Sequence, residues 1–291
     1  MKPNLFIVGA PKCGTTAWFE YLRTHPEIFI PEHKEFHFFT TDLPKKRVMT
    51  HEAEYEALFE RGRGKAIVGD GSVFHLYSAE AARNIYAYNP DARIIVFLRD
   101  QADMLFSMHH QFLWMFSESI EDFEEAWRLS ECRDPKSIPK HCPDPKLLNY
   151  AALGRFHEQI QRYLDTFGSD RVRIFHFRDW SKNPRATYLQ ILDFLGLDDD
   201  GRTEFPPVNE AKAHRFKWLG KLIVRRPQWT ETMIRPIRKM LGKEKLRIAD
   251  RLSLMLAHKG YRSRISPELR QEVMQYYAAE NALTDRLLTG N

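Results

Sequence analysis

The stretch "IVGAPKCGTTAWF" (residues 7–19) decides the fold. It joins an apolar run, typical of a buried strand, to a helical pattern through a loop bounded by Gly9 and Gly14. In phosphate-binding loops of this outline, backbone N–H groups and the positive end of the helix dipole hold an oxyanion. Loops for nucleoside triphosphates place a lysine directly after the second glycine, whereas Lys12 lies inside this loop. We therefore expect a site for one phosphate-like group rather than for a metal-bound triphosphate.

Strand and helix patterns alternate along the chain. Short apolar runs predict buried strands at residues 4–9, 66–69, 93–98 and 171–177. Helical patterns lie at residues 15–24, 52–60, 79–88, 101–116, 147–167 and 184–195. This order predicts an α/β fold, a P-loop-like parallel β-sheet with helices on both faces.

The chain is expected to form a single domain, residues 1–291, with an α/β core (1–210) and a helical C-terminal extension (211–291). Only helices are predicted after residue 212, with one starting at Ser266-Pro267. Residues 130–147 contain four prolines and no apolar period, which indicates a long loop of the kind that often covers a site.

Basic residues are concentrated in one region. Residues 212–251 hold 13 Lys or Arg and only 3 Asp or Glu. This stretch predicts peripheral contact with a membrane surface or a polyanion, or else a solvated helix packed on the domain. No nucleic-acid recognition motif accompanies it, so a nucleic-acid partner is not expected. Three cysteines, and no apolar run of the ~18 residues that a membrane span needs, favour a cytoplasmic protein.

A second cationic position follows another predicted strand. "RIIVFLRD" ends in Arg99, and Ser107 follows eight residues later on the predicted helix. An arginine at a strand end and a hydroxyl two turns into the next helix could hold a second phosphate through charge-assisted hydrogen bonds. The alternative for Arg99 is a structural ion pair with Asp103.

These motifs resemble the sulfotransferases that use 3′-phosphoadenosine 5′-phosphosulfate (PAPS), with 3′-phosphoadenosine 5′-phosphate (PAP) as product and no required metal. The resemblance implies that the loop holds the 5′-phosphosulfate and that Arg99 and Ser107 hold the 3′-phosphate. Lys212 and Arg215 are candidates to complete the 3′-phosphate site. The implied loop residues are Pro11, Lys12, Cys13, Gly14, Thr15 and Thr16.

The stretch "KEFHFF" (residues 34–39) resembles the carbohydrate-modifying branch of these enzymes. This implies that Glu35 is the catalytic base, that Lys34 assists at the sulfuryl oxygens and that Lys12 neutralises charge on the leaving oxygen. A rival base is His75 in "GDGSVFHLY", because the pKa of a histidine lies near ~6.5. His37 is expected to orient the loop or to pack beside Phe38.

The predicted function is transfer of a sulfuryl group from PAPS to a hydroxyl or amine of a carbohydrate or glycan. Sulfation of a lipid or small metabolite by the same chemistry is an alternative. An alternative of another class is a magnesium-dependent P-loop kinase with Asp70 as its metal-binding acid. Trp18 stands one residue beyond the family's adenine-stacking position, which leaves that role open.

Overall fold

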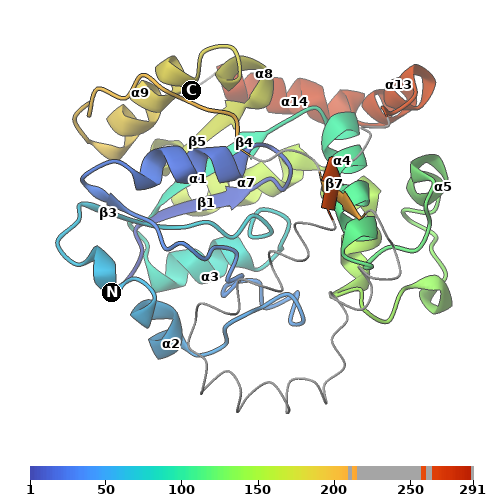
Figure 1. The fold of residues 1–291 in the computed structure, drawn as a ribbon, viewed down its shortest axis with the longest axis horizontal. Coiled ribbons are helices and arrows are strands. Elements are labelled where there is room, and N and C mark those ends of the chain that lie inside the picture. Colours follow the sequence, from blue (N-terminus) through green and yellow to red (C-terminus); the bar gives the residue numbers. More distant parts are fainter. Residues whose placement is uncertain (209–211, 215–256, 260–263, 290–291) are drawn as a thin grey trace.

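The computed structural model describes residues 1–208, 212–214, 257–259 and 264–289, and its centre is a parallel sheet (Figure 1). The five strands lie in the order β2-β3-β1-β4-β5. All four pairings are parallel, and β1 lies in the middle between β3 and β4. The strands are β1 (Leu5–Gly9), β2 (Ile28–Phe29), β3 (Ile67–Asp70), β4 (Arg93–Leu98) and β5 (Val172–His176).

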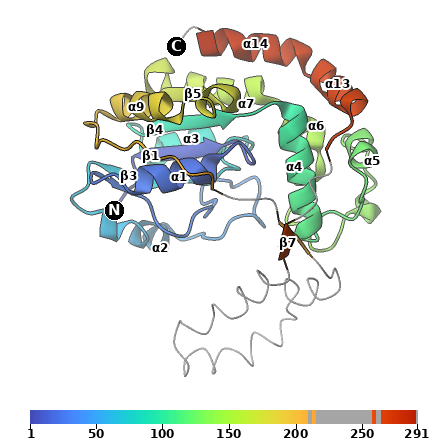
Figure 2. The same cartoon turned by 45° about the horizontal axis from the view of Figure 1, so that its top comes forward.

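A group of helices stands beside the carboxyl ends of the strands (Figure 2). Its longest member is α4 (Gln101–Trp114), and α13 (Pro267–Tyr276) packs against α4. The predicted start of α13 is confirmed, because the Ser266 hydroxyl accepts a hydrogen bond from the Leu269 N–H and Pro267 follows it. The remaining members are α5 (Phe123–Arg128) and α6 (Tyr150–Leu153).

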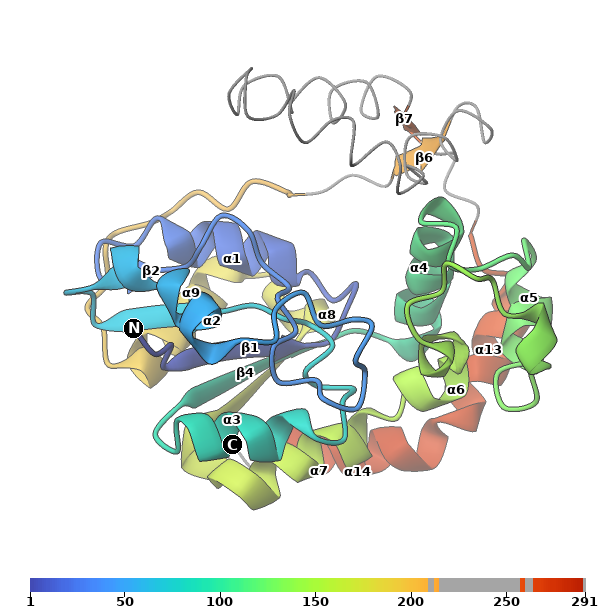
Figure 3. The same cartoon turned by 90° about the horizontal axis from the view of Figure 1, so that it is seen from below.

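Helices cover both faces of the sheet, as predicted (Figure 3). One face carries α1 (Thr15–Arg23) and α9 (Pro184–Leu195), and the other carries α3 (Ala81–Tyr88) and α7 (Phe156–Phe167). The C-terminal helix α14 (Ala278–Thr289) packs on α7. Because neither face meets water, every residue of β1 is buried, which explains the apolar run that predicted it.

Shorter elements connect these layers. They are α2 (Glu52–Ala57), α8 (Phe177–Trp180), an antiparallel pair of β6 (Lys212–His214) and β7 (Ala257–Lys259), and 3-10 turns at Glu60–Gly62, Pro135–Ser137, Pro145–Leu148 and Ser169–Arg171.

Several predicted elements need correction. The expectation of helices alone after residue 212 is wrong, since β6 and β7 pair there. The helix predicted at 147–167 is interrupted between α6 and α7 at Gly154, where an added Cβ would lie 2.5 Å from the ring of Tyr277. Strand β2 and helix α5 escaped prediction because two and six residues are too short to show a period.

None of residues 130–147, the loop predicted to be of the kind that often covers a site, lines the cavity described below. Arg133 lies in a buried ion pair with Glu118, with 2.7 Å between Nη1 and Oε1. Cys142 is also buried. The other end of the segment contacts the chain before β3, because Lys146 Nζ donates to the Asp42 carbonyl at 3.2 Å. Most of the basic stretch, residues 215–256, lies outside the described residues, so its predicted roles stay predictions.

Candidate active site

A cavity of about 1280 Å³ opens at the carboxyl ends of the strands. Its lining comes from the β1–α1 loop, the segment after α1, the β4–α4 corner, α8 and the C-terminal part of the chain. Most of the predicted site residues line it together: Pro11, Lys12, Gly14, Thr15, Thr16, Lys34, Glu35, Arg99 and Ser107.

The β1–α1 loop is shaped by its backbone. Lys12 and Gly14 both have left-handed backbone conformations, with φ of 62° and 84°. Alternating right- and left-handed residues turn successive N–H groups toward one point, which makes an anion-binding concavity. Helix α1 starts at the next residue, and neither a capping side chain nor an acidic residue occupies its first turn. Its first N–H groups are therefore available to an oxyanion.

Cys13 is the predicted loop residue that does not line the cavity. Its side chain is fully buried, and its thiol donates to the carbonyl of Pro11 at 3.4 Å. Burial raises the pKa of this thiol to about 12. Cys13 therefore packs beneath the loop as a neutral side chain, and only its backbone can take part in anion binding.

Two lysines and a carboxylate face the same cavity beside the loop. The Lys34 ammonium donates a hydrogen bond to the Thr16 hydroxyl and lies 4.9 Å from the centre of the Phe19 ring. Burial lowers the pKa of both Lys12 and Lys34, and the charge of Glu35 opposes this lowering. The site thus places two partly desolvated cations next to one anion.

The backbone holds Glu35 in an unusual conformation. Glu35 and His37 have φ of 68° and 50°, a region that costs free energy for residues with a Cβ. The His37 N–H donates to the Ser72 hydroxyl at 3.0 Å, and its ring Nε2 lies 3.8 Å from Glu35 Oε2. Burial by itself raises the pKa of Glu35, but the nearby His37 ring and the charges of Lys34 and Lys46 lower it by more, so the net pKa is lowered. Glu35 is therefore ionised and able to accept a proton.

The rival base and the metal-binding acid of the kinase alternative both lie outside the cavity lining. His75 is fully buried, its ring centre lies 6.2 Å from that of His37, and burial lowers its pKa well below the usual value. Asp70 is 1% exposed and accepts a hydrogen bond from the Tyr55 hydroxyl at 2.7 Å. Neither side chain is placed to meet an acceptor or a metal in the cavity.

Arg99 and Ser107 line the cavity from the β4–α4 corner. Arg99 follows β4, and its guanidinium carbon lies 4.9 Å from the centre of the Phe177 ring. Its Nη2 also lies 3.7 Å from Asp103 Oδ2, so the predicted ion pair and the predicted cavity position both occur. Of the other two candidates, Lys212 begins β6 and Arg215 lies outside the described residues.

The sequence did not reveal every residue of the lining. Trp180 lies against the loop, because a Cβ added to Gly14 would be 2.3 Å from Trp180 Cζ2. Trp18 instead is fully buried and stacks on Phe97, with 5.3 Å between ring centres. Arg270 of α13 also lines the cavity. The sequence did not single out Trp180 or Arg270, and tertiary packing identifies them as part of the lining.

This arrangement defines a P-loop-like α/β protein with an anion-binding loop after its central strand. Residues 2–206 match the family model described as "Sulfotransferase domain", which covers more than half of the chain. The chain belongs to the sulfotransferase family. This membership and the burial of Asp70 both count against the kinase alternative.

Known proteins with similar sequences are sulfotransferases. Carbohydrate sulfotransferase 15 of Mus musculus is 25% identical over 249 residues, which cover 67% of this chain and 44% of that protein. Heparan sulfate glucosamine 3-O-sulfotransferase 6 of Homo sapiens is 33% identical over 111 residues, which cover 38% of this chain and 31% of that protein. The chain thus spans less than half the length of these relatives.

A solved structure has the same fold. The sulfotransferase from Alicyclobacillus acidocaldarius superposes with a TM-score of 0.72 at 26% identity, covering 99% of this chain and 96% of that one. Its similarity extends past the matched family domain into the C-terminal part of the chain.

The expected cytoplasmic location is wrong. The membrane-associated sulfotransferase kil1 of Dictyostelium discoideum is 26% identical over 280 residues, which cover 71% of this chain and 59% of that protein. Among the described residues, no helix has the length and apolar character needed to cross a membrane.

Proposed function

We propose that this sulfotransferase moves a sulfuryl group from PAPS to a hydroxyl or amine of a carbohydrate acceptor. The observation that carries the proposal is the meeting of Lys12, Lys34 and Glu35 in the cavity that also contains Arg99 and Ser107. Cations for two separate anionic groups and one ionised carboxylate are the set that this transfer needs.

The residues present fit the donor. The loop offers uncapped N–H groups of α1, the Thr15 and Thr16 hydroxyls and the Lys12 ammonium to a 5′-phosphosulfate. Arg99 and Ser107 offer a guanidinium and a hydroxyl to a 3′-phosphate. The cavity volume of about 1280 Å³ exceeds the ~1,000 Å³ of large small-molecule sites and leaves room for an acceptor.

Three side chains have roles in the transfer. The acceptor oxygen or nitrogen forms a bond to sulfur, the bond between sulfur and the bridging oxygen breaks, and PAP leaves. Glu35 takes the proton that the acceptor loses. Lys12 neutralises the charge that develops on the bridging oxygen, and Lys34 does so at the sulfuryl oxygens. The contact of Lys34 with Thr16 holds it near the loop.

The names of the similar proteins support a carbohydrate acceptor. Both carbohydrate sulfotransferase 15 and heparan sulfate glucosamine 3-O-sulfotransferase 6 modify sugars by name. The same side chains would serve a lipid or small metabolite with an accessible hydroxyl, because the roles of Lys12 and Glu35 do not depend on the rest of the acceptor.

Calorimetric titration with PAP, beside ATP and magnesium, tests the donor. We expect PAP to bind without metal, and Lys12→Ala to weaken this binding by about tenfold through loss of a charge-assisted contact. A wild-type protein that binds no PAP, or that binds ATP tightly only with magnesium, would contradict the proposal.

A further inference from the structure

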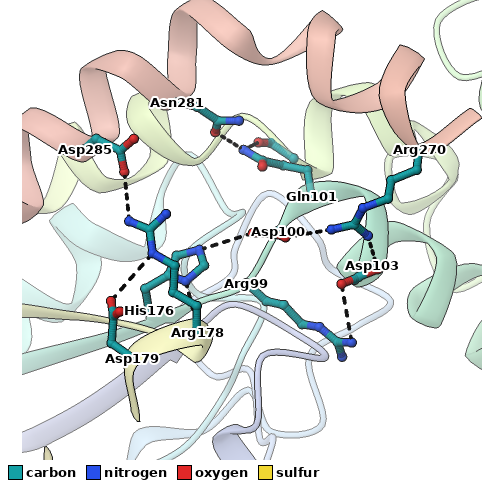
Figure 4. Close-up of polar contacts among 11 residues, drawn as sticks. Arg99, Asp100, Gln101, Asp103, His176, Arg178, Asp179, Arg270, Asn281 and Asp285 are labelled. Atoms are coloured by element: carbon teal, nitrogen blue, oxygen red, sulfur yellow. Dashed lines mark hydrogen bonds and ion pairs between the residues drawn. The ribbon is translucent and has the colours of Figure 1, made fainter. Parts of the chain in front are cut away.

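Arg270 of α13 connects the C-terminal helices to the β4–α4 corner (Figure 4). Its Nη2 lies 2.7 Å from Asp100 Oδ2, and its Nη1 forms a shorter contact with Asp103 Oδ1. One guanidinium thus binds two carboxylates that flank the first turn of α4. Arg270 and Asp103 also line the cavity.

Asp103 lies between two arginines. Its Oδ2 is 3.7 Å from Arg99 Nη2, whereas its Oδ1 is in close contact with Arg270 Nη1. Arg270 is therefore the nearer partner, and the contact with Arg99 is too long for a hydrogen bond. If Arg270 were absent, Asp103 would have Arg99 as its cationic partner, and the guanidinium of Arg99 would be drawn toward α4.

The charge balance at this corner depends on Arg270. Arg99 and Arg270 carry two positive charges, and Asp100 and Asp103 carry two negative charges. His176 Nε2 lies 3.7 Å from Asp100 Oδ1, but burial lowers the pKa of His176, so it adds little positive charge near neutral pH. Without Arg270 the corner would be net negative, which opposes binding of a phosphate dianion.

Contacts that do not involve Arg270 hold α14 in place. The Gln101 amide donates to Asn281 Oδ1 at 2.5 Å, and Arg178 Nη2 lies 3.4 Å from Asp285 Oδ1 (Figure 4). Arg178 does not line the cavity. Docking of α14 and charge neutralisation by Arg270 can therefore be separated by mutation.

We propose that Arg270 is a positioning residue that keeps Arg99 available for the 3′-phosphate and thereby sets the selectivity for 3′-phosphorylated nucleotides. This rests on the proposed function, in which Arg99 and Ser107 hold that phosphate. The C-terminal helices then belong to the donor site, although they lie outside residues 2–206 of the matched family domain.

The test compares titration of PAP with titration of adenosine 5′-monophosphate, which lacks the 3′-phosphate. Arg270→Gln should weaken PAP binding about tenfold and the monophosphate less than about twofold, because only the 3′-phosphate lies near the unneutralised carboxylates. Adding Asp103→Asn to Arg270→Gln should restore most of the PAP affinity. Arg178→Gln is the matched control for helix docking and should leave both affinities within about twofold.

The outcomes separate the two proposals. If the wild-type protein binds no PAP, the proposed function fails and this inference falls with it. If the wild type binds PAP and Arg270→Gln binds it equally well, only the inference fails. A double variant as weak as Arg270→Gln overturns it too, because Arg270 would then contact the phosphate itself.

Asp103→Asn alone gives a measurement that does not depend on the folding of Arg270→Gln, since Arg270 keeps its bond to Asp100. We expect it to bind PAP at least as tightly as the wild type. A tenfold weaker affinity would mean that Asp103 orients Arg99 and does not compete for it, which would overturn the proposal.

Discussion

The two sides of the cavity are built in different ways. On the loop side, residues 11–16, the anion site consists of backbone N–H groups arranged by left-handed residues and an uncapped helix. On the α4 side, Arg99 depends on ion pairs, and Arg270 reaches Asp103 and Asp100 from 167 and 170 residues away in the chain. A site built from backbone groups should be disturbed by an added Cβ. The anion affinity of a site built from charged side chains should instead fall when one charge is lost.

The largest expected effect concerns chemistry on the loop side. Glu35→Gln keeps the shape of the side chain but removes the base, so turnover should fall about 10³-fold. PAP affinity, measured by titration, should change little. Glu32→Gln, on an exposed neighbour, is the matched control and should keep full turnover. Normal turnover in Glu35→Gln would show that Glu35 is not the base.

The second prediction concerns Asp70, which lies behind the Glu35 segment. Burial raises its pKa to about 6 from 3.8, with hydrogen bonds from Tyr55 and Ser72 opposing the rise. The protonated form therefore favours folding: its contribution is complete below pH 3.8 and is lost as the pH rises through about 6. Over this window the free energy of unfolding should fall by about 3 kcal/mol.

Asp70→Asn should remove that part of the pH dependence, because the amide does not titrate. Urea titrations at several pH values between 4 and 8 provide the measurement. Equal slopes of stability against pH in the wild type and Asp70→Asn would show that Asp70 does not have a raised pKa.

The third prediction tests the backbone character of the loop. Gly14 and Gly64 both have positive φ, 84° and 88°, but a Cβ would meet Trp180 at Gly14 and nothing within 4 Å at Gly64. Gly64→Ala should cost about 1 kcal/mol of stability from strain alone. Gly14→Ala should cost about 2 kcal/mol more, because the indole must move. Thermal unfolding of the two variants measures the difference in stability. Equal losses of stability would mean that the Trp180 indole moves aside at no cost.

The smallest expected effect is on the α4 side. Ser107→Ala removes one neutral hydrogen-bond donor, so PAP should bind about fivefold more weakly. Adenosine 5′-monophosphate should bind as before. A similar loss for both nucleotides in calorimetric titrations would place Ser107 away from the 3′-phosphate and would weaken the contrast between the two sides.

The same contrast explains what the sequence could predict. The loop residues are contiguous, so residues 7–19 were enough to predict strand, loop and helix together. Arg99 and Ser107 belong to one strand–helix unit, which also made them visible. Arg270 was missed because its position depends on the packing of α13 against α4, and helical periodicity in α13 says nothing about a partner so distant in the chain.

The burial of individual side chains in the site motifs could not be predicted from the sequence either. Cys13 stands in the middle of the loop motif, yet its side chain points into the core, and His75 lies in a turn but is fully enclosed. His75 was a candidate because of its residue type, and Cys13 was a candidate because it stands within the loop motif. Only the three-dimensional arrangement shows that neither side chain lines the cavity.

The adjacency of β1 and β4 has a further consequence. Gly9 pairs with Val96, so the two corners that follow these strands start from backbones that lie about 4.8 Å apart across the sheet. The main chain therefore fixes the distance between the starting points of the two corners, and the ion pairs around Arg99 set where its guanidinium lies. Side chains elsewhere in the cavity can change without moving these two starting points.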